Sequence, residues 1–145
     1  MRLSALLLVV AAVLGAPGAA TSGDPFADRP ATAADLVQRL ALAHAEHDLV
    51  AMLNLFDWRG LDAATRHHIE GMVARDLDNR LVEVDVVAAP AEGMPNAPGT
   101  SPNRPITHFV VAVYDAPDGR RYVSLHQVGE RDGIALIALP IAETY

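Results

Sequence analysis

Hydrophobic residues recur first at helical and then at alternating spacing along this chain. Thr32 with Asp35 three positions later resembles a capping box, and the apolar residues that follow it lie at helical spacing. Asp48 and Asp62 are predicted to cap two further helices, the first of which ends near 57–60. The residues expected on the buried sides of the three helices are Leu36, Leu40, Ala43 and His47, then Leu49, Met52, Leu53 and Phe56, then Thr65, Ile69, Met72, Val73 and Leu77.

From about Leu81 the period becomes alternating, which predicts a first strand. Its expected inner residues are Val82, Val84 and Val86, and its expected outer residues are Glu83 and Asp85. Segment 90–105 is rich in proline and is predicted to be a long loop without a sheet ladder. Three more strands are predicted over 106–115, 121–128 and 134–139. The order indicates an α+β fold, with N-terminal helices packed on an antiparallel sheet of about four strands.

The turn Pro117-Asp118-Gly119 predicts the register of the central hairpin. A three-residue loop pairs Tyr114 with Tyr122 and Val110 with His126. The face expected to join the core carries Phe109, Val111, Val113, Val123 and Leu125, and the other face carries His108, Tyr114, Tyr122, Ser124 and His126. Antiparallel sheets commonly keep one face in water, which favours a solvated role for the half-polar face. The lining of a cavity is the alternative.

The N-terminus has the pattern of a cleaved secretory signal. Met1 and Arg2 precede an apolar run over 3–14, and Gly18 and Ala20 fit the small-residue requirement of a signal peptidase. The predicted organisation is a signal peptide over 1–20, a flexible leader over 21–31 and a single domain over 32–145. We therefore expect a bacterial periplasmic or secreted protein with no membrane attachment after cleavage.

Composition excludes several classes of function. The chain has no cysteine, which excludes thiol catalysis, thiolate metal sites and a disulfide scaffold. Its formal net charge of −7 argues against nucleic acid as a partner. His44 and His47 share one side of a helix and His67 or His68 could add a third ligand, yet isolated histidines at helix ends are far more common than metal sites. We expect no metal and no cofactor.

The stretch from Leu40 to Phe56, with Glu46-His47-Asp48-Leu49 at its corner, resembles the opening of nuclear-transport-factor-2-like domains of the cystatin-like superfamily. This resemblance implies a cone whose curved sheet surrounds an apolar pocket. The same scaffold serves ketosteroid isomerase, scytalone dehydratase and polyketide cyclases as well as non-catalytic binding modules. The fold alone does not choose between these functions.

Candidate chemistry lies on the half-polar sheet face. The catalytic candidates are His108 or His126 as an acid or base with Tyr114 or Tyr122. Ser124 and His126 could form a nucleophile and base, but no sharp nucleophile turn surrounds Ser124. Trp58 is expected at the core edge with Arg59 over its ring, and ligand stacking is its alternative role.

The leading hypothesis is non-catalytic binding of a small apolar ligand or a protein partner. The residues expected to bind the ligand are His108, Val110, Tyr114, Ser124, His126 and Trp58. One alternative is an acid/base enzyme of the isomerase or cyclase type, and another is a periplasmic inhibitor or immunity-type protein. The sequence leaves the oligomeric state open.

Overall fold

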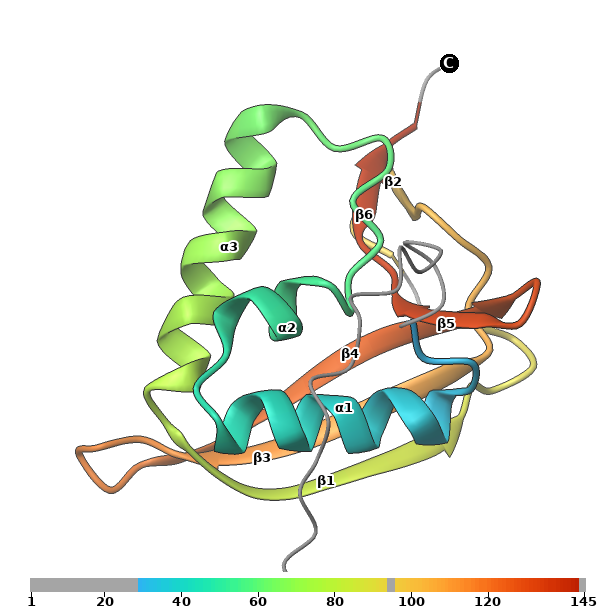
Figure 1. Ribbon diagram of the computed structural model, residues 1–145. Coiled ribbons are helices and arrows are strands. Elements are labelled where there is room, and N and C mark those ends of the chain that lie inside the picture. Colours follow the sequence, from blue (N-terminus) through green and yellow to red (C-terminus); the bar gives the residue numbers. More distant parts are fainter. Residues whose placement is uncertain (1–28, 94–95, 144–145) are drawn as a thin grey trace, which may run out of the picture.

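In a computed structural model, residues 29–93 and 96–143 are described, so the predicted signal peptide and most of the predicted leader lie outside them. Three helices precede a four-stranded sheet and a small two-stranded sheet (Figure 1). The elements are α1 (Ala33–Ala45), α2 (Leu49–Leu53), α3 (Ala63–Leu77), β1 (Arg80–Ala88), β2 (Thr100–Pro102), β3 (His108–Asp115), β4 (Arg121–Arg131), β5 (Ile134–Ile137) and β6 (Pro140–Ala142). The α+β prediction is confirmed. Across these two ranges, each helix falls short of the length and apolar character that a bilayer crossing requires.

All three predicted helices begin at their predicted caps. The side chains of Thr32, Asp48 and Asp62 each accept a hydrogen bond from the backbone N–H three residues later, at 3.1, 2.9 and 2.7 Å. These bonds satisfy backbone donors that a helix leaves unpaired in its first turn, which explains why each helix begins there.

Two of the residues expected on the buried sides of the helices lie elsewhere. His47 is exposed because α1 ends at Ala45 and His47 adopts a left-handed conformation with φ of 53°. His44, one turn earlier, takes the buried position. Met72 is largely exposed because its neighbour Val73 faces the core, and adjacent helix residues point about 100° apart.

The main sheet has the order β1-β3-β4-β5, with every neighbouring pair antiparallel. Val110 pairs with His126 and Tyr114 pairs with Tyr122, which confirms the predicted register. The turn closes with a bond from the Gly119 N–H to the Ala116 carbonyl at 2.9 Å, and Gly119 has φ of 83°. This register decides which side chains share a face of the sheet.

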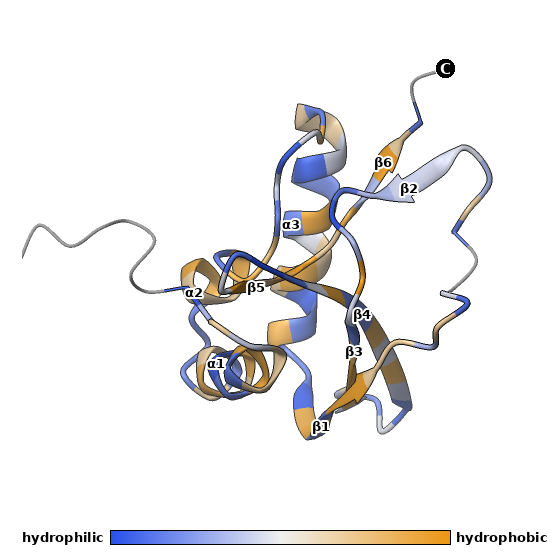
Figure 2. Ribbon diagram, turned by 90° about the vertical axis from the view of Figure 1, so that its right-hand side faces the viewer, coloured by the Kyte–Doolittle hydropathy of each residue, from blue (hydrophilic) through white to orange (hydrophobic). Residues whose placement is uncertain are grey.

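The expected assignment of the two sheet faces is wrong. Helices α1 and α2 lie on the side of the sheet that bears Val110 and His126, and the views show no helix on its other side (Figures 1 and 2). Val110 has 0% of its surface exposed, whereas Val123 is 62% exposed on the opposite face. Of the residues predicted to form the core face only Phe109 is buried; Val111 and Val113 are intermediate, and Val123 and Leu125 are exposed. Small residues such as Ala112 let the helices approach the covered face closely, which alternation alone does not indicate.

The first strand contains an irregularity that moves Val82 away from the core. The pairing of β1 with β3 shifts between Leu81 and Glu83, as in a β-bulge. Val82 is therefore exposed, and Leu81 packs against the core with Val84 and Val86 instead. The predicted alternation is correct only beyond this bulge.

Segment 90–105 also differs from its prediction. Thr100–Pro102 forms β2 and pairs with β6 in a second antiparallel sheet. Asn103 anchors the segment, because its side-chain amide donates to the Asp57 and Arg59 carbonyls at 2.6 and 3.0 Å and its side-chain oxygen accepts from the Leu139 N–H at 3.0 Å. The partner strand lies about forty positions later in the chain, so local composition did not reveal this ladder.

Candidate functional site

Polar side chains from α3 and β4 meet beneath the helices. The Tyr122 hydroxyl donates to Asp76 Oδ1 at 3.0 Å and accepts from Asn79 Nδ2 at 2.7 Å. His126 Nε2 lies 3.2 Å from Ser124 Oγ on the same face of β4. The Tyr114 ring stacks on Tyr122 with 5.3 Å between ring centroids. The register of β3 and β4 therefore brings four of the sequence candidates together, while α3 supplies Asp76 and the turn after α3 supplies Asn79.

Burial controls the protonation of this cluster. Burial lowers the pKa of His126, and the Asp76 charge offsets only part of that effect. Burial, with a hydrogen bond to Asp76, raises the pKa of Tyr122 to about 12. The pKa of Tyr114 also lies well above its usual range, chiefly through burial. At neutral pH the imidazole is therefore neutral and both phenols keep their protons.

The interior of the cluster has almost no free volume. A void of about 10 Å³ lies between Asp76, Tyr114 and His126. Its apolar walls come from α1, α2, the segment after α2, α3 and β5, namely Leu40, Met52, Phe56, Val73 and Ile137. This volume is at most about that of one water molecule, so no organic ligand fits there.

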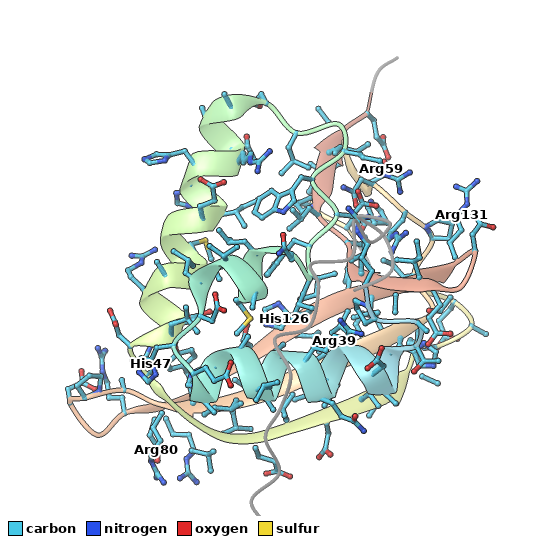
Figure 3. The ribbon with its side chains drawn as sticks, in the orientation of Figure 1. Arg39, His47, Arg59, Arg80, His126 and Arg131 are labelled. Atoms are coloured by element: carbon cyan, nitrogen blue, oxygen red, sulfur yellow. The ribbon has the colours of Figure 1, made fainter. Side chains whose placement is uncertain are left out.

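His126 also borders a larger groove at the open edge of β4. β5 pairs with β4 only from Val128 onward, so the edge of β4 is uncovered by β5 at His126. The groove has a volume of about 340 Å³. We call it the β4-edge groove and define it by Phe56, Leu125, His126, Ile137, Leu139 and Pro140. The Phe56 and His126 rings meet edge to face at 6.2 Å between centroids, and Figure 3 shows His126 reaching from β4 toward α2.

The remaining predicted ligand-binding residues are dispersed. Val110 and Tyr114 are buried in the core, and Ser124 reaches the groove only through His126. His108 begins β3 and is paired with Val128, and its Nδ1 is 3.0 Å from Thr107 Oγ1 and 3.7 Å from Glu130, outside the groove lining. The six candidates thus do not form a single site.

Trp58 lies at the edge of the core, in a different cleft. Its indole N–H donates to the Leu53 carbonyl at 2.9 Å. The guanidinium over its ring belongs to Arg66, at 5.0 Å from the centroid, and not to Arg59 as expected. Arg59 pairs instead with Asp57, which lies two residues before it. Arg66 reaches the indole because it lies in the first turn of α3, which packs beside Trp58, whereas Arg59 is drawn to the Asp57 carboxylate.

Asp76 is the residue of this cluster that the sequence analysis missed. It lies three positions after Val73 in α3, on the side of the helix that faces the core. The sequence signal that could have identified Asp76 is a carboxylate three residues after Val73 and directly before Leu77, both of which were predicted to face the core.

His44 and His47, the two histidines of the metal hypothesis, differ in burial and in their contacts. His44 is buried, with Nε2 at 3.3 Å from the Asp76 carbonyl, whereas His47 is exposed. Their ring centroids are 6.2 Å apart. Within 29–93 and 96–143, no three or more histidine and acidic side chains gather in a way that could hold a metal ion. The absence of a metal from the working protein stays a prediction.

Comparisons with protein-family models, with curated proteins and with solved structures find no match to this chain. The resemblance to nuclear-transport-factor-2-like domains therefore stays a prediction. Inferences about function rest on the geometry of the chain itself.

Proposed function

We propose that the protein binds a small apolar ligand without catalysis, in the β4-edge groove, with His126 as its polar anchor. The observation that carries this proposal is the position of His126, whose ring forms part of the groove wall while Nε2 is engaged by Ser124. Such a position leaves Nδ1 as the ring atom that can bond a ligand. The groove also carries the polar side chains of Asn96, Thr100 and Gln127 among its apolar walls, and a few polar groups between apolar walls are the usual composition of a small-molecule site.

The size of the groove supports the same proposal. Its volume of about 340 Å³ lies at the lower end of the range for ligand sites, so it suits a compact molecule. Phe56, Ile137 and Leu139 belong to or border the core, which gives the groove a rigid apolar floor. The chain is predicted to be exported, so the ligand would come from the periplasm or the medium.

Acid/base catalysis has weaker support. The Tyr122 hydroxyl is already held by Asp76 and Asn79, and Tyr114 is buried against it. Both phenols have a pKa far above neutral, which makes them poor partners for proton transfer at neutral pH. A ligand in the groove would meet His126 without a second titratable group beside it among the residues that define the groove.

Binding can be tested with N-phenyl-1-naphthylamine, an uncharged apolar dye whose fluorescence rises in apolar sites. We expect saturable binding to the purified protein, and His126→Ala should weaken the affinity about fivefold, the equivalent of one hydrogen bond. Leu125→Asp should weaken dye binding without disturbing the packing of the core, because Leu125 lines the groove and its side chain is exposed.

The matched control is His108→Ala, which removes a histidine that lies on the same sheet face but is not among the residues that line the groove. It should leave dye binding unchanged. Failure of the dye to saturate, or equal weakening by His108→Ala and His126→Ala, would contradict the proposal.

A further inference from the structure

A second cleft, of about 630 Å³, collects an unusual number of arginines. We call it the arginine cleft and define it by its charged residues Arg29, Arg59, Arg104, Arg131, Asp57 and Asp132. Arg29 also interacts with other groups. The remaining three arginines and two aspartates give a formal charge of +1 in a chain whose net charge is −7. Figure 3 shows Arg59 and Arg131 at the same end of the molecule, away from Arg80. A local excess of positive charge on an acidic protein raises the concentration of anions at that site.

Arg104 is the buried component of this cleft. Only 6% of its surface is exposed, and its Nη1 donates to the Gly129 carbonyl at 2.8 Å. Its Nε lies 3.2 Å from Asp57 Oδ2 but makes no hydrogen bond. A Cβ on Gly129 would clash with the Pro105 carbonyl oxygen and would lie 2.8 Å from the Arg104 side chain, so glycine is needed for segment 104–105 to lie against β4. Arg104 therefore holds a fixed positive charge in the wall of the cleft, and burial makes such a charge costly unless anions lie near it.

The acidic residues of the cleft are engaged by the arginines and do not neutralise it. Arg59 Nε and Nη2 donate to the two oxygens of Asp57 at 2.8 and 2.5 Å, and Arg104 shares the same carboxylate. Asp132 contacts Arg131 at 3.4 Å, but both side chains are exposed and such a pair contributes little. Burial lowers the pKa of Arg104, and the neighbouring charges of Arg59, Arg131 and Arg29 lower it further despite Asp57. The cleft thus has an excess of positive charge that a bound anion would relieve.

The other wall of the cleft is apolar. It consists of Phe56, Trp58, Ile134 and Leu136, and the Phe56 and Trp58 rings lie 5.6 Å apart between centroids. An inorganic anion would leave this wall without contacts. We propose that the arginine cleft binds a small organic carboxylate carried on an aliphatic or aromatic body. The carboxylate bonds the guanidinium groups in the geometry that arginine favours, and the body packs on the rings.

The probes for this proposal are phenylacetate and hexanoate, each titrated into the whole protein by calorimetry. We expect at least one of them to bind, and 2-phenylethanol, the uncharged counterpart of phenylacetate, to bind at least tenfold more weakly. Arg131→Gln should weaken carboxylate binding about tenfold by removing a charge from an exposed position of the cleft.

The matched control is Arg120→Gln, which removes an exposed arginine paired with Asp118 in the distant β3–β4 turn. It should leave the affinity unchanged, and Leu125→Asp should do so too, because Leu125 lines the β4-edge groove and not this cleft. Four results would overturn the proposal: no binding of either carboxylate, equal binding of the alcohol, tighter binding of inorganic phosphate, or equal losses in the Arg120 and Arg131 variants.

Discussion

The two faces of the main sheet are both rich in valine, yet only one of them belongs to the core. The inner face packs Val110 and Val128 beneath the helices with no exposed surface, while Leu125 on the outer face is 48% exposed. The inner face also carries the polar residues Tyr122 and His126, each of which has a hydrogen-bond partner. Apolar content therefore does not select the buried face. The covered face is the one whose polar groups find partners in α3 and β4.

The outer face shows what the helices leave uncovered. Val87, Val123 and Leu125 lie on it with large exposed fractions, and Glu83 and Asp85 from β1 lie among them. Charged residues on an edge strand discourage pairing with other chains, which offsets the risk that an exposed apolar sheet face brings. The contrast between the faces leads to three measurable differences.

The largest difference is expected between matched valine truncations. Val110→Ala should lower the free energy of unfolding by about 2 kcal/mol, because it removes two methyl groups from a fully buried position and leaves a cavity. Val123→Ala, at 62% exposure, should change it by about 0.5 kcal/mol or less. Urea denaturation of both variants measures the difference. Equal losses would mean that the outer face is also covered in solution.

Local features of the fold could be predicted from the sequence because their causes are local. The caps at Thr32, Asp48 and Asp62 depend on residues three positions apart, and the β3–β4 register depends on one turn. The choice of sheet face depends on how the helices pack on the sheet, which alternation does not encode.

The site residues follow the same rule. His126 and Tyr122 share a strand, so the sequence could group them, whereas Asp76 joins them from a helix. The arginine cleft could not be predicted, because its four arginines lie at 29, 59, 104 and 131 and share no spacing. Contacts between distant segments bring them together: Asn103 donates to the Asp57 and Arg59 carbonyls, and the Ala135 N–H donates to the Pro30 carbonyl.

A smaller difference is expected at the turn that sets the register of both faces. Gly119→Ala should lower the free energy of unfolding by about 1 kcal/mol, because Gly119 has φ of 83° and an added Cβ disfavours this conformation. Gly71→Ala is the matched control, since Gly71 lies inside α3 with open space around it and should gain about 0.5 to 1 kcal/mol. Thermal denaturation distinguishes the two signs. A stabilising Gly119→Ala would contradict the assigned turn.

The smallest difference is expected in the response to pH, and it concerns His126 on the inner face. Burial holds the pKa of His126 in the folded protein below its ordinary value of 6.5, so the unfolded chain binds a proton more readily. The contribution of the neutral imidazole to stability is therefore complete above about pH 6.5 and is lost as the pH falls from there toward the folded-state pKa. The pKa of Asp57 lies below its ordinary value of 3.8, because hydrogen bonds and charges from Arg59 and Arg104 outweigh the effect of burial. Protonation of Asp57 therefore lowers the stability of the fold only at more acidic pH.

Stability measured by urea denaturation between pH 7 and pH 5 isolates this effect. The wild-type protein should lose stability as the pH falls over this range, and His126→Gln should remove part of that slope because glutamine does not titrate. His47→Gln, which replaces an exposed histidine at the α1–α2 corner, should leave the slope unchanged. An unchanged slope in His126→Gln would show that the imidazole is as easily protonated in the folded chain as in the unfolded one. The β4-edge groove would then hydrate the imidazole enough to cancel the effect of burial, and the contrast between the two faces would be weaker at His126 than at Val110.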